Sequence, residues 1–370
     1  MLLHVLPRMD PQRYEITLCS LTTAGPVADN IRAFGFEVIA LAARGRADLG
    51  ALIRLSRELR HRRTDILHSH LFHANMAARL VGKLSRVPVV ITDERDVGAW
   101  KTRSQLLLER LTVRLCDQVT AVSQAAADWA ATRQGVSRSR LRVIRNGVAL
   151  PPPSADREVL RHRMRAELGL PQETPIVLSV GRIDPMKGYE YLVDAVPAVA
   201  EHMPQVHFFV VGGTAEKAAQ YRARLLAQAA DLGIASLITF GSHRDDVPDL
   251  MRAADLLVLS SVTEGLPNVL LEAMAAGLPP VATAVGGCCE LDDHGRNLRL
   301  VRPRDPAALA EAILALLQDQ ELSRTMAESA RAFVAAHYSW EKTVAELDQL
   351  YTDLLARRPR PGLGRSTADQ

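Results

Sequence analysis

The sequence predicts an α/β protein with two doubly wound domains that face each other across a cleft. Its 370 residues exceed the roughly 250–300 residues at which a single hydrophobic core stops growing. Short apolar runs rich in β-branched residues alternate with longer amphipathic stretches, which is the pattern of parallel strands connected by helices. A segment with three consecutive prolines, Asn146–Ser154, interrupts the alternation and indicates a stiff linker between the domains.

The first domain is predicted to span residues 1–150. Its apolar runs are expected to form six strands, and the amphipathic stretches between them form helices. The predicted strands are Tyr14–Leu18, Glu37–Leu41, Ile66–Ser69, Val87–Thr92, Gln118–Val122 and Leu141–Ile144. The clearest helices are Leu49–Arg62, Ala74–Ser85 and Arg103–Leu115.

The second domain is predicted to span residues 151–338, and it repeats the alternating pattern. The expected strands are Ile176–Val180, His207–Val211, Leu237–Phe240, Leu256–Leu259 and Pro280–Thr283. Two helices follow near Pro306–Asp319 and Glu321–His337, and a last helix covers residues 339–357. The tail, residues 358–370, is polar and rich in Gly and Pro, so we expect it to be disordered.

Composition excludes several classes of protein. Hydrophobic residues make up 48% of the chain and charged residues 24%, the balance of a soluble globular protein. No run approaches the ~20 apolar residues of a membrane-spanning helix, and the first ten residues do not resemble a signal peptide. The four cysteines lack CxxC spacing, which indicates a reducing cytoplasm and no zinc site.

Charge is distributed unevenly between the two halves. Residues 1–150 hold 23 Lys and Arg against 13 Asp and Glu, whereas residues 151–370 hold 22 against 29. One basic run comprises Arg54, Arg57, Arg60, Arg62 and Arg63. It is either a solvated helix face or a surface that meets anionic lipid or a lipid-linked phosphate at the inner face of the membrane. Nucleic acid is not expected, because aromatics are only 4% of the chain and none interleaves with this run.

The first motif with chemistry is the loop Val180–Gly188, directly after a predicted strand. Ligands of open α/β sheets bind in such loops, beyond the carboxyl ends of the strands. Arg182 and Lys187 stand there between Gly181 and Gly188, and a planar guanidinium with an ammonium group suits a diphosphate. The alternative is two solvated surface cations in a turn.

The second motif is Ser260–Gly277, after the strand that ends at Leu259. Glu264 lies in the loop, Pro267 suits the first helical turn and Gly277 suits the end of the helix. The amides of Gly265, Leu266, Pro267, Asn268 and Val269 would then surround a helix N-terminus, where a phosphate or a sugar oxygen is favoured (proline itself lacks the N–H). Glu272, further along the helix, is suited to accept hydrogen bonds from ribose hydroxyls. A surface glutamate paired with a neighbour is the alternative.

These motifs, taken in order, resemble the retaining glycosyltransferases of family 4. The resemblance rests on Glu264 and Glu272 as a Glu-x7-Glu pair, the GRxxxxKG run Gly181–Gly188 and the paired glycines of VATAVGG. It extends to DILHSHLFHA, VTAVSQ, VIRNGV and the closing YSWEKTVAELDQLY. It implies the GT-B fold, two Rossmann-like domains facing across a cleft, with the last helix returning to the first domain.

The resemblance also implies roles for these residues. Arg182 and Lys187 would neutralise the diphosphate as it leaves, Glu264 would contact the transferred sugar, and Glu272 would bind the ribose. His70 matches the family's histidine near the reacting sugar, although a histidine satisfied at a strand end is the alternative. His68 and His73 are expected to be structural or to face the acceptor. Glu264 and His70 are the predicted catalytic residues.

The implied reaction moves a sugar from a UDP- or GDP-activated donor to a glycan or lipid-linked acceptor in cell-envelope polysaccharide or glycolipid synthesis. No DxD motif stands near the diphosphate loop, so we expect a metal-independent enzyme without a cofactor, in which cations stabilise the leaving charge. Two alternatives remain: a non-catalytic relative that binds nucleotide sugars or glycans, and another two-domain Rossmann enzyme. The latter is an epimerase or an oxidoreductase, and an oxidoreductase is disfavoured because no GxGxxG motif is present.

The chain departs from the family pattern in two places. Family members open with a buried strand and a Gly-rich loop, whereas the first 21 residues here resemble the end of a helix followed by the second strand. The resemblance therefore implies that the first strand and its loop are missing. In addition, Cys289 stands before Glu290 where the family commonly has proline or arginine, and Leu298–Arg299 replaces a common Gly-Leu pair.

Overall fold

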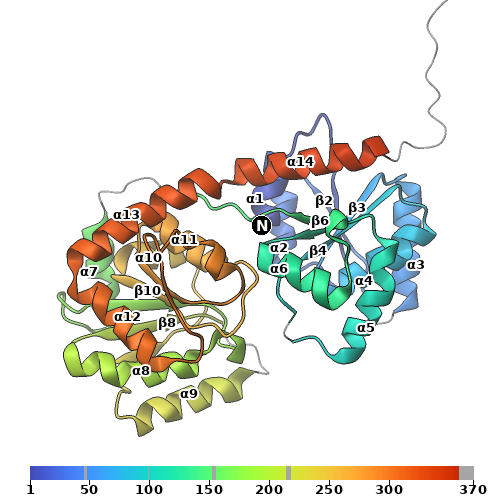
Figure 1. The fold of residues 1–370 in the computed structure, drawn as a ribbon. Helices are drawn as coiled ribbons and strands as arrows, with labels where there is room; N and C mark the ends of the chain where they lie inside the picture. Colours follow the sequence, from blue (N-terminus) through green and yellow to red (C-terminus); the bar gives the residue numbers. More distant parts are fainter. Residues whose placement is uncertain (46–47, 99, 152–155, 214–217, 358–370) are drawn as a thin grey trace, which may run out of the picture. The chain divides into compact units, whose positions relative to one another are not determined.

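The computed structural model describes residues 1–370 apart from 46–47, 99, 152–155, 214–217 and 358–370. The tail predicted to be disordered, 358–370, lies outside the described residues. The chain divides into two compact units (Figure 1). One unit comprises Met1–Gly147 and the segment that begins at Trp340, and the other comprises Val148–Ser339. The sequence had predicted the first boundary after residue 150.

The second unit contains one six-stranded sheet in which all pairs of neighbouring strands are parallel. The strands are β7 (Ile176–Val180), β8 (His207–Val211), β9 (Ile238–Phe240), β10 (Leu256–Leu259), β11 (Pro280–Thr283) and β12 (Arg299–Val301). Their order is β12-β11-β10-β7-β8-β9, so the chain moves outward from β7 and then returns to its other side with β10. The reversal between β7 and β10 is where open α/β sheets bind ligands.

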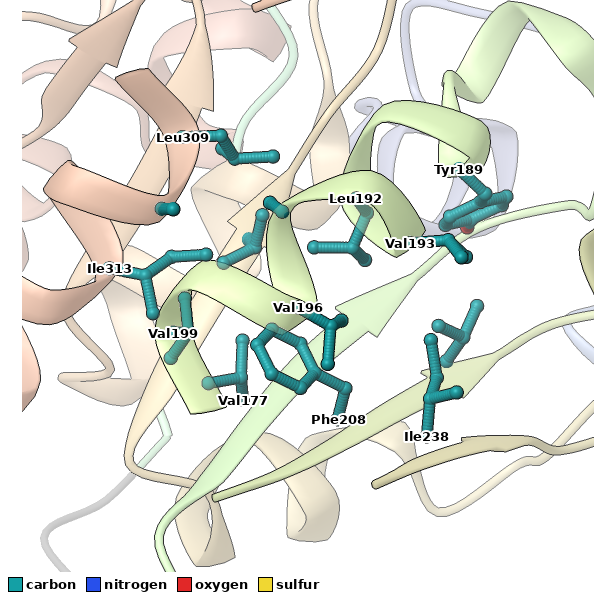
Figure 2. Packing of buried hydrophobic residues seen from close by; sticks show 14 of the residues in the cluster. Val177, Tyr189, Leu192, Val193, Val196, Val199, Phe208, Ile238, Leu309 and Ile313 are labelled. Carbon is teal, nitrogen blue, oxygen red and sulfur yellow. The ribbon is translucent and has the colours of Figure 1, made fainter. Parts of the chain in front are cut away.

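Helices cover this sheet. They are α7 (Arg157–Glu167), α8 (Tyr189–His202), α9 (Ala219–Asp231), α10 (Val247–Ala253), α11 (Asn268–Ala276), α12 (Pro306–Gln318) and α13 (Gln320–His337). Figure 2 shows Leu192 and Val196 of α8 and Ile313 of α12 packed against Val177 and Phe208 of the sheet. All five side chains are at most 1% exposed, and each such burial stabilises the fold by about 1.5–3 kcal/mol.

The first unit contains two parallel sheets. One pairs β1 (Thr17–Ser20) with β2 (Glu37–Ala40), and the other has the order β3-β4-β5-β6. The four strands of the second sheet are β3 (Ile66–His70), β4 (Val89–Glu94), β5 (Gln118–Ala121) and β6 (Leu141–Val143). The predicted start of the first strand at Tyr14 was wrong, because the Tyr14 amide bonds to the Asp10 carbonyl in a turn.

Helices cover both faces of the first unit. On one side α3 (Leu49–His61) and α4 (Phe72–Leu84) lie over one hydrophobic cluster, and α5 (Arg103–Thr112) contacts α4. The other side is covered by α1 (Leu2–Val5) and α14 (Trp340–Arg357). His4 stacks on Trp340 at 4.7 Å between ring centroids, so the last helix is part of the first unit.

Two further α-helices of the first unit remain. They are α2 (Pro26–Ala33) and α6 (Gln124–Trp129). Among all the helices that the structure describes, none combines the length and the apolar character needed to cross a membrane.

Candidate active site

The two predicted loops of the second unit meet at the reversal between β7 and β10. Lys187 ends a short 3₁₀ turn, Pro185–Lys187, that follows β7, and Glu264 lies in the loop after β10. Lys187 Nζ is 2.6 Å from Glu264 Oε1. The side chains are 19% and 11% exposed, so the pair is partly shielded from water. The structure thus brings together two residues that are 77 positions apart.

Hydrogen bonds fix Glu264 and the loop of Lys187. The hydroxyl of Ser261, a fully buried residue, donates to Glu264 Oε1 over 2.6 Å. Ser260 Oγ donates to the Lys187 carbonyl over 3.0 Å, and the Val262 amide donates to the Met186 carbonyl over 2.9 Å. The carboxylate is therefore held in one orientation, and the two loops are tied together.

Two glycines permit the backbones of these loops to approach each other. Gly188 has a φ of +61°, and a Cβ there would lie 2.3 Å from the Ser260 carbonyl oxygen. Gly286 has a φ of +50°, and a Cβ there would lie 1.8 Å from the Glu264 carbonyl oxygen. Side chains at both positions would push the loops apart. The first of the paired glycines of the VATAVGG run thus packs directly against the loop of Glu264.

The start of α11 differs slightly from the prediction. The helix begins at Asn268, and Pro267 is the residue before it rather than its first residue. No side chain caps the helix at Pro267, which leaves the positive end of the helix dipole beside Gly265 and Leu266. Gly277 ends the helix with a φ of +72°, as predicted.

Arg182 and Glu272 are more exposed than the ion pair. Arg182 lies on the loop after β7, whose neighbouring residue Ile183 is fully buried. Glu272 lies on the exposed side of α11. Within the described chain, no hydrogen bond or ion pair joins either side chain to Lys187 or Glu264. Both remain candidates for binding the donor.

The two adjacent cysteines have different surroundings. Cys288 is fully buried and Cys289 is exposed. Burial, together with the negative charge of Glu264, raises the pKa of the Cys288 thiol well above its usual range. The Cys288 thiol is therefore a packing group next to the loop of Glu264.

The first unit carries a separate polar cluster at the carboxyl ends of β3 and β4. His70 and Asp93 are partners in the register of these two parallel strands. His70 Nδ1 is 2.9 Å from Asp93 Oδ2, and Arg95 NH1 donates to the same oxygen over 2.9 Å. Because a carboxylate only accepts, Nδ1 of His70 carries the proton of this hydrogen bond.

Asp93 is ionised within this cluster. Its side chain is only 5% exposed, and this burial raises its pKa. The hydrogen bond from His70 and the charge of Arg95 outweigh burial and hold the pKa well below the usual range of a carboxyl. The Thr120 hydroxyl donates to Asp93 Oδ1 over 3.0 Å. The carboxylate thereby orients the His70 ring.

His68 is a structural residue in this cluster. Its Nδ1 is 2.8 Å from the Tyr351 hydroxyl and its Nε2 is 3.3 Å from Thr120 Oγ1. Since Thr120 donates its proton to Asp93, it accepts from His68 Nε2–H, and Nδ1 accepts from Tyr351. Burial, with the neighbouring charge of His70, lowers the pKa of His68 to about 3. The ring is neutral at physiological pH.

Sequence reasoning missed Asp93, Arg95 and Ser261. Asp93 and Arg95 lie in ITDERD, directly after the predicted strand Val87–Thr92, which is where parallel sheets place functional side chains. Arg95 NH2 also donates to Asn146 Oδ1 over 3.1 Å, and Asn146 belongs to the motif VIRNGV. No group of three or more His, Cys, Asp or Glu side chains in the described residues is arranged to hold a metal ion.

Comparisons with known proteins agree with this arrangement. Residues 1–150 match the model of the family described as Glycosyltransferase Family 4, and residues 161–333 match that of Glycosyl transferases group 1. A D-inositol 3-phosphate glycosyltransferase of Salinispora arenicola is 30% identical over 79% of this chain and 69% of its own length. That of Nocardia farcinica is 31% identical over 83% and 71%.

Solved structures share the fold. The Anabaena protein Alr3699/HepE, solved in complex with UDP-glucose, superposes with a TM-score of 0.83 at 23% identity over 95% of this chain and 94% of its own. WaaG, a glycosyltransferase involved in lipopolysaccharide biosynthesis, has a TM-score of 0.65 at 21% identity over 91% of each chain.

Two Rossmann-like units and these family matches define the protein as a glycosyltransferase of the GT-B fold class. The chain belongs to glycosyltransferase family 4. This assignment favours the transferase over the epimerase and the oxidoreductase.

Proposed function

We propose that this glycosyltransferase moves a hexose, with retention of anomeric configuration, from a UDP- or GDP-activated donor to a glycan or lipid-linked acceptor. The observation that carries the proposal is the pair Lys187–Glu264, 2.6 Å apart beside the start of α11. A cation, a carboxylate and a helix N-terminus at the reversal of a parallel sheet suit a donor that has a diphosphate and a sugar.

In the proposed reaction, the bond between the anomeric carbon and the diphosphate oxygen breaks. Negative charge grows on that oxygen, and Lys187, Arg182 and the amides at the start of α11 stabilise it. Glu264 contacts the transferred sugar, Glu272 binds the ribose, and the backbone from Gly265 to Val269 holds sugar hydroxyls or phosphate. Because cations of the chain supply the stabilisation, we propose that neither a metal nor a cofactor is needed.

His70 has a complementary role in the proposal. With Nδ1–H bonded to Asp93, its Nε2 accepts a hydrogen bond from a sugar hydroxyl near the reacting carbon. A residue positioned to attack that carbon is not assigned, so the acceptor is proposed to attack from the face that the diphosphate leaves. Attack on that face gives retention.

The donor nucleotide and the cellular location are proposed from relatives and from charge. The solved complexes of Alr3699/HepE contain UDP and UDP-glucose, which favours UDP over GDP. A lipid-linked or glycan acceptor would place the enzyme in polysaccharide or glycolipid synthesis of the cell envelope. We propose a cytoplasmic protein at the inner face of the membrane, because the basic first half suits anionic lipid.

Thermal unfolding tests the donor site. The chain is heated alone and with UDP, GDP, UDP-sugars, GDP-sugars or NAD. A ligand at about 100 times its dissociation constant adds about 2.7 kcal/mol, which raises the Tm of a domain of this size by roughly 5–10 °C. We expect stabilisation by one nucleotide class. Stabilisation by NAD alone would contradict the proposal.

Turnover is tested with the donor that stabilises the chain. Arg182→Ala combined with Lys187→Ala is expected to abolish nearly all nucleotide release while the fold is retained. The control is Arg302→Ala, an exposed arginine of the same unit. Undiminished turnover in the double variant would refute the assigned site. Donor binding without turnover in the wild type would instead support the non-catalytic alternative.

A further inference from the structure

Three helices of the first unit carry large apolar side chains on their outer sides. Leu107 and Leu111 of α5 are 58% and 67% exposed, and Leu84 of α4 is 73% exposed. We call the exposed set the leucine face. It comprises Leu49 and Ile53 of α3, Leu80 and Leu84 of α4, and Leu107, Leu108 and Leu111 of α5. Single exposed leucines are common, but such a group marks an interaction surface.

Helix α4 contacts both α3 and α5 in the first unit (Figure 1), so the three helices form one layer. The hydroxyls of Ser56 and Ser85 are 2.8 Å apart, which ties α3 to the end of α4. The Thr112 hydroxyl lies 3.4 Å from Met76 Sδ, which ties α5 to α4. Helices α3 and α4 bury their inner sides in the same hydrophobic cluster, and Val113, the residue directly after α5, belongs to that cluster as well. Their exposed residues, spaced about one turn apart, therefore lie on the outer side of that layer.

Positive charge surrounds the leucine face. The exposed cations are Arg57, Lys83, Arg86, Arg103 and Arg114, together with Arg60 and Arg110, each of which also donates one hydrogen bond to a backbone carbonyl. The helices α3, α4 and α5 contain only two carboxylates. Glu58 is paired with Arg62, and Glu109 is buried against Lys101. The outer side of this layer therefore offers cations and apolar groups without a compensating exposed carboxylate on these helices.

We propose that the leucine face docks on the surface of an anionic lipid bilayer. Amphipathic helices bind such surfaces by inserting apolar side chains at the headgroup level while cations meet lipid phosphates. The inference names the surface for the membrane contact proposed above, and so rests on that part of the proposed function.

The structure changes the set of cations that we assign to the membrane-binding surface. Arg62 forms a two-pronged pair with Glu37, and Arg54 donates two hydrogen bonds to the Leu41 carbonyl. Both were counted in the basic run, yet both stabilise the first unit internally. The cations of α4 and α5, which are distant in sequence, complete the surface instead.

The test is flotation of the full chain with vesicles of phosphatidylcholine alone or mixed with phosphatidylglycerol. We expect binding to the anionic vesicles only. Raising the salt from about 0.1 M to about 1 M shortens the Debye length from about 10 Å to about 3 Å and should weaken binding. Arg103→Gln with Arg114→Gln should weaken it by about fivefold for each removed cation. Leu107→Gln with Leu111→Gln should weaken it at least about tenfold.

Matched controls lie in the second unit. Val159 and Leu226 are 66% and 44% exposed, and their change to Gln should leave vesicle binding unchanged, as should Arg302→Gln. Equal binding to neutral vesicles, no binding to anionic ones, or unchanged binding of the α5 variants would overturn the proposal. So would self-association that the Leu107 and Leu111 changes abolish in the absence of lipid, because it would assign this face to a second copy.

Vesicle binding is separable from the proposed reaction. Stabilisation by nucleotide is measured on the same preparations without lipid. If the chain floats with anionic vesicles but no nucleotide stabilises it, only the proposed donor site is contradicted. If a nucleotide stabilises the chain but it does not float with the vesicles, only the proposed membrane surface is contradicted.

Discussion

Lys187 Nζ and Glu264 Oε1 lie 2.6 Å apart, so the proposed diphosphate-binding cation has a counter-ion within the protein itself. A bound diphosphate would compete with Glu264 for that charge. The site therefore gains affinity for phosphate only when the carboxylate moves away or accepts a sugar hydroxyl instead.

The first prediction concerns this competition. Glu264→Gln should bind the nucleoside diphosphate several-fold more tightly than the wild type and yet lose turnover, because the competing charge and the sugar contact disappear together. Lys187→Ala should lose about 10- to 100-fold in the same affinity, the effect of a charge-assisted hydrogen bond of about 1.5–3 kcal/mol. Titration calorimetry measures both, with the nucleoside lacking phosphate as control. Weaker diphosphate binding in Glu264→Gln would contradict the competition.

A second prediction separates close packing from backbone strain. Gly286 and Gly277 both have positive φ, but of the two only Gly286 lies against another backbone segment. A Cβ added at Gly286 would lie 1.8 Å from the Glu264 carbonyl oxygen. A Cβ added at Gly277 would have no other atom within 4 Å. Gly277→Ala should therefore lower the free energy of unfolding by only about 1 kcal/mol, the cost of the left-handed backbone. Gly286→Ala should cost more and displace Glu264, so turnover should fall sharply. Chemical unfolding and donor turnover of both variants check this, and equal effects would refute it.

Much of the second unit could be predicted from its sequence, because buried parallel strands consist of short runs of apolar residues. Five of its strands were predicted closely. The sixth, Arg299–Val301, was missed because it begins with an exposed arginine and, with only three residues, is too short to show an apolar run or an alternation of apolar and polar residues. The loops of Lys187 and Glu264 were recognised by their glycines and their place after strands, but their mutual contact depends on the order of the strands.

The first unit was harder to predict. A single alternating pattern gave no sign that β1 and β2 form a sheet apart from the other four strands. His70 was recognised from its motif, whereas Asp93 was not, because its role depends on the register that sets it beside His70. Register is a property of paired strands and cannot be read from one strand alone.

A third prediction concerns acid stability through His68. Burial lowers the pKa of His68 to about 3, while an unfolded histidine titrates near about 6.5. Between these values the unfolded chain binds the extra proton, so the stability that His68 contributes is present above about pH 6.5 and is lost as pH falls toward about 3. Between about pH 6.5 and 5 the free energy of unfolding should therefore fall less in His68→Gln than in the wild type. The difference between the two proteins should be up to about 1.4 kcal/mol per pH unit. Urea unfolding at several pH values measures it, with His61→Gln, an exposed position, as control.

The last prediction is that Asp93 acts by positioning His70. Asp93 accepts from His70 Nδ1 over 2.9 Å, and Asp93→Asn removes the charge that fixes the ring and its tautomer. We expect kcat to fall about 10- to 100-fold, as for other groups that orient a functional histidine, with a smaller change in the KM of the donor. Asp117→Asn is the matched control, because that carboxylate accepts from the Val90 amide in the same sheet and lies outside the proposed site.

A double-variant cycle distinguishes positioning from mere stabilisation. If Asp93 acts through His70, Asp93→Asn should have little further effect on kcat once His70 is alanine, because the group it orients is gone. Independent losses that multiply in the double variant would show that Asp93 acts without His70. Thermal unfolding of all four proteins is needed beside the kinetics, since removal of one member of a buried charged pair costs about 3–5 kcal/mol. The loss of kcat in Asp93→Asn could instead match its loss of stability and be equalled in Asp117→Asn. That result would show that Asp93 is only a structural residue.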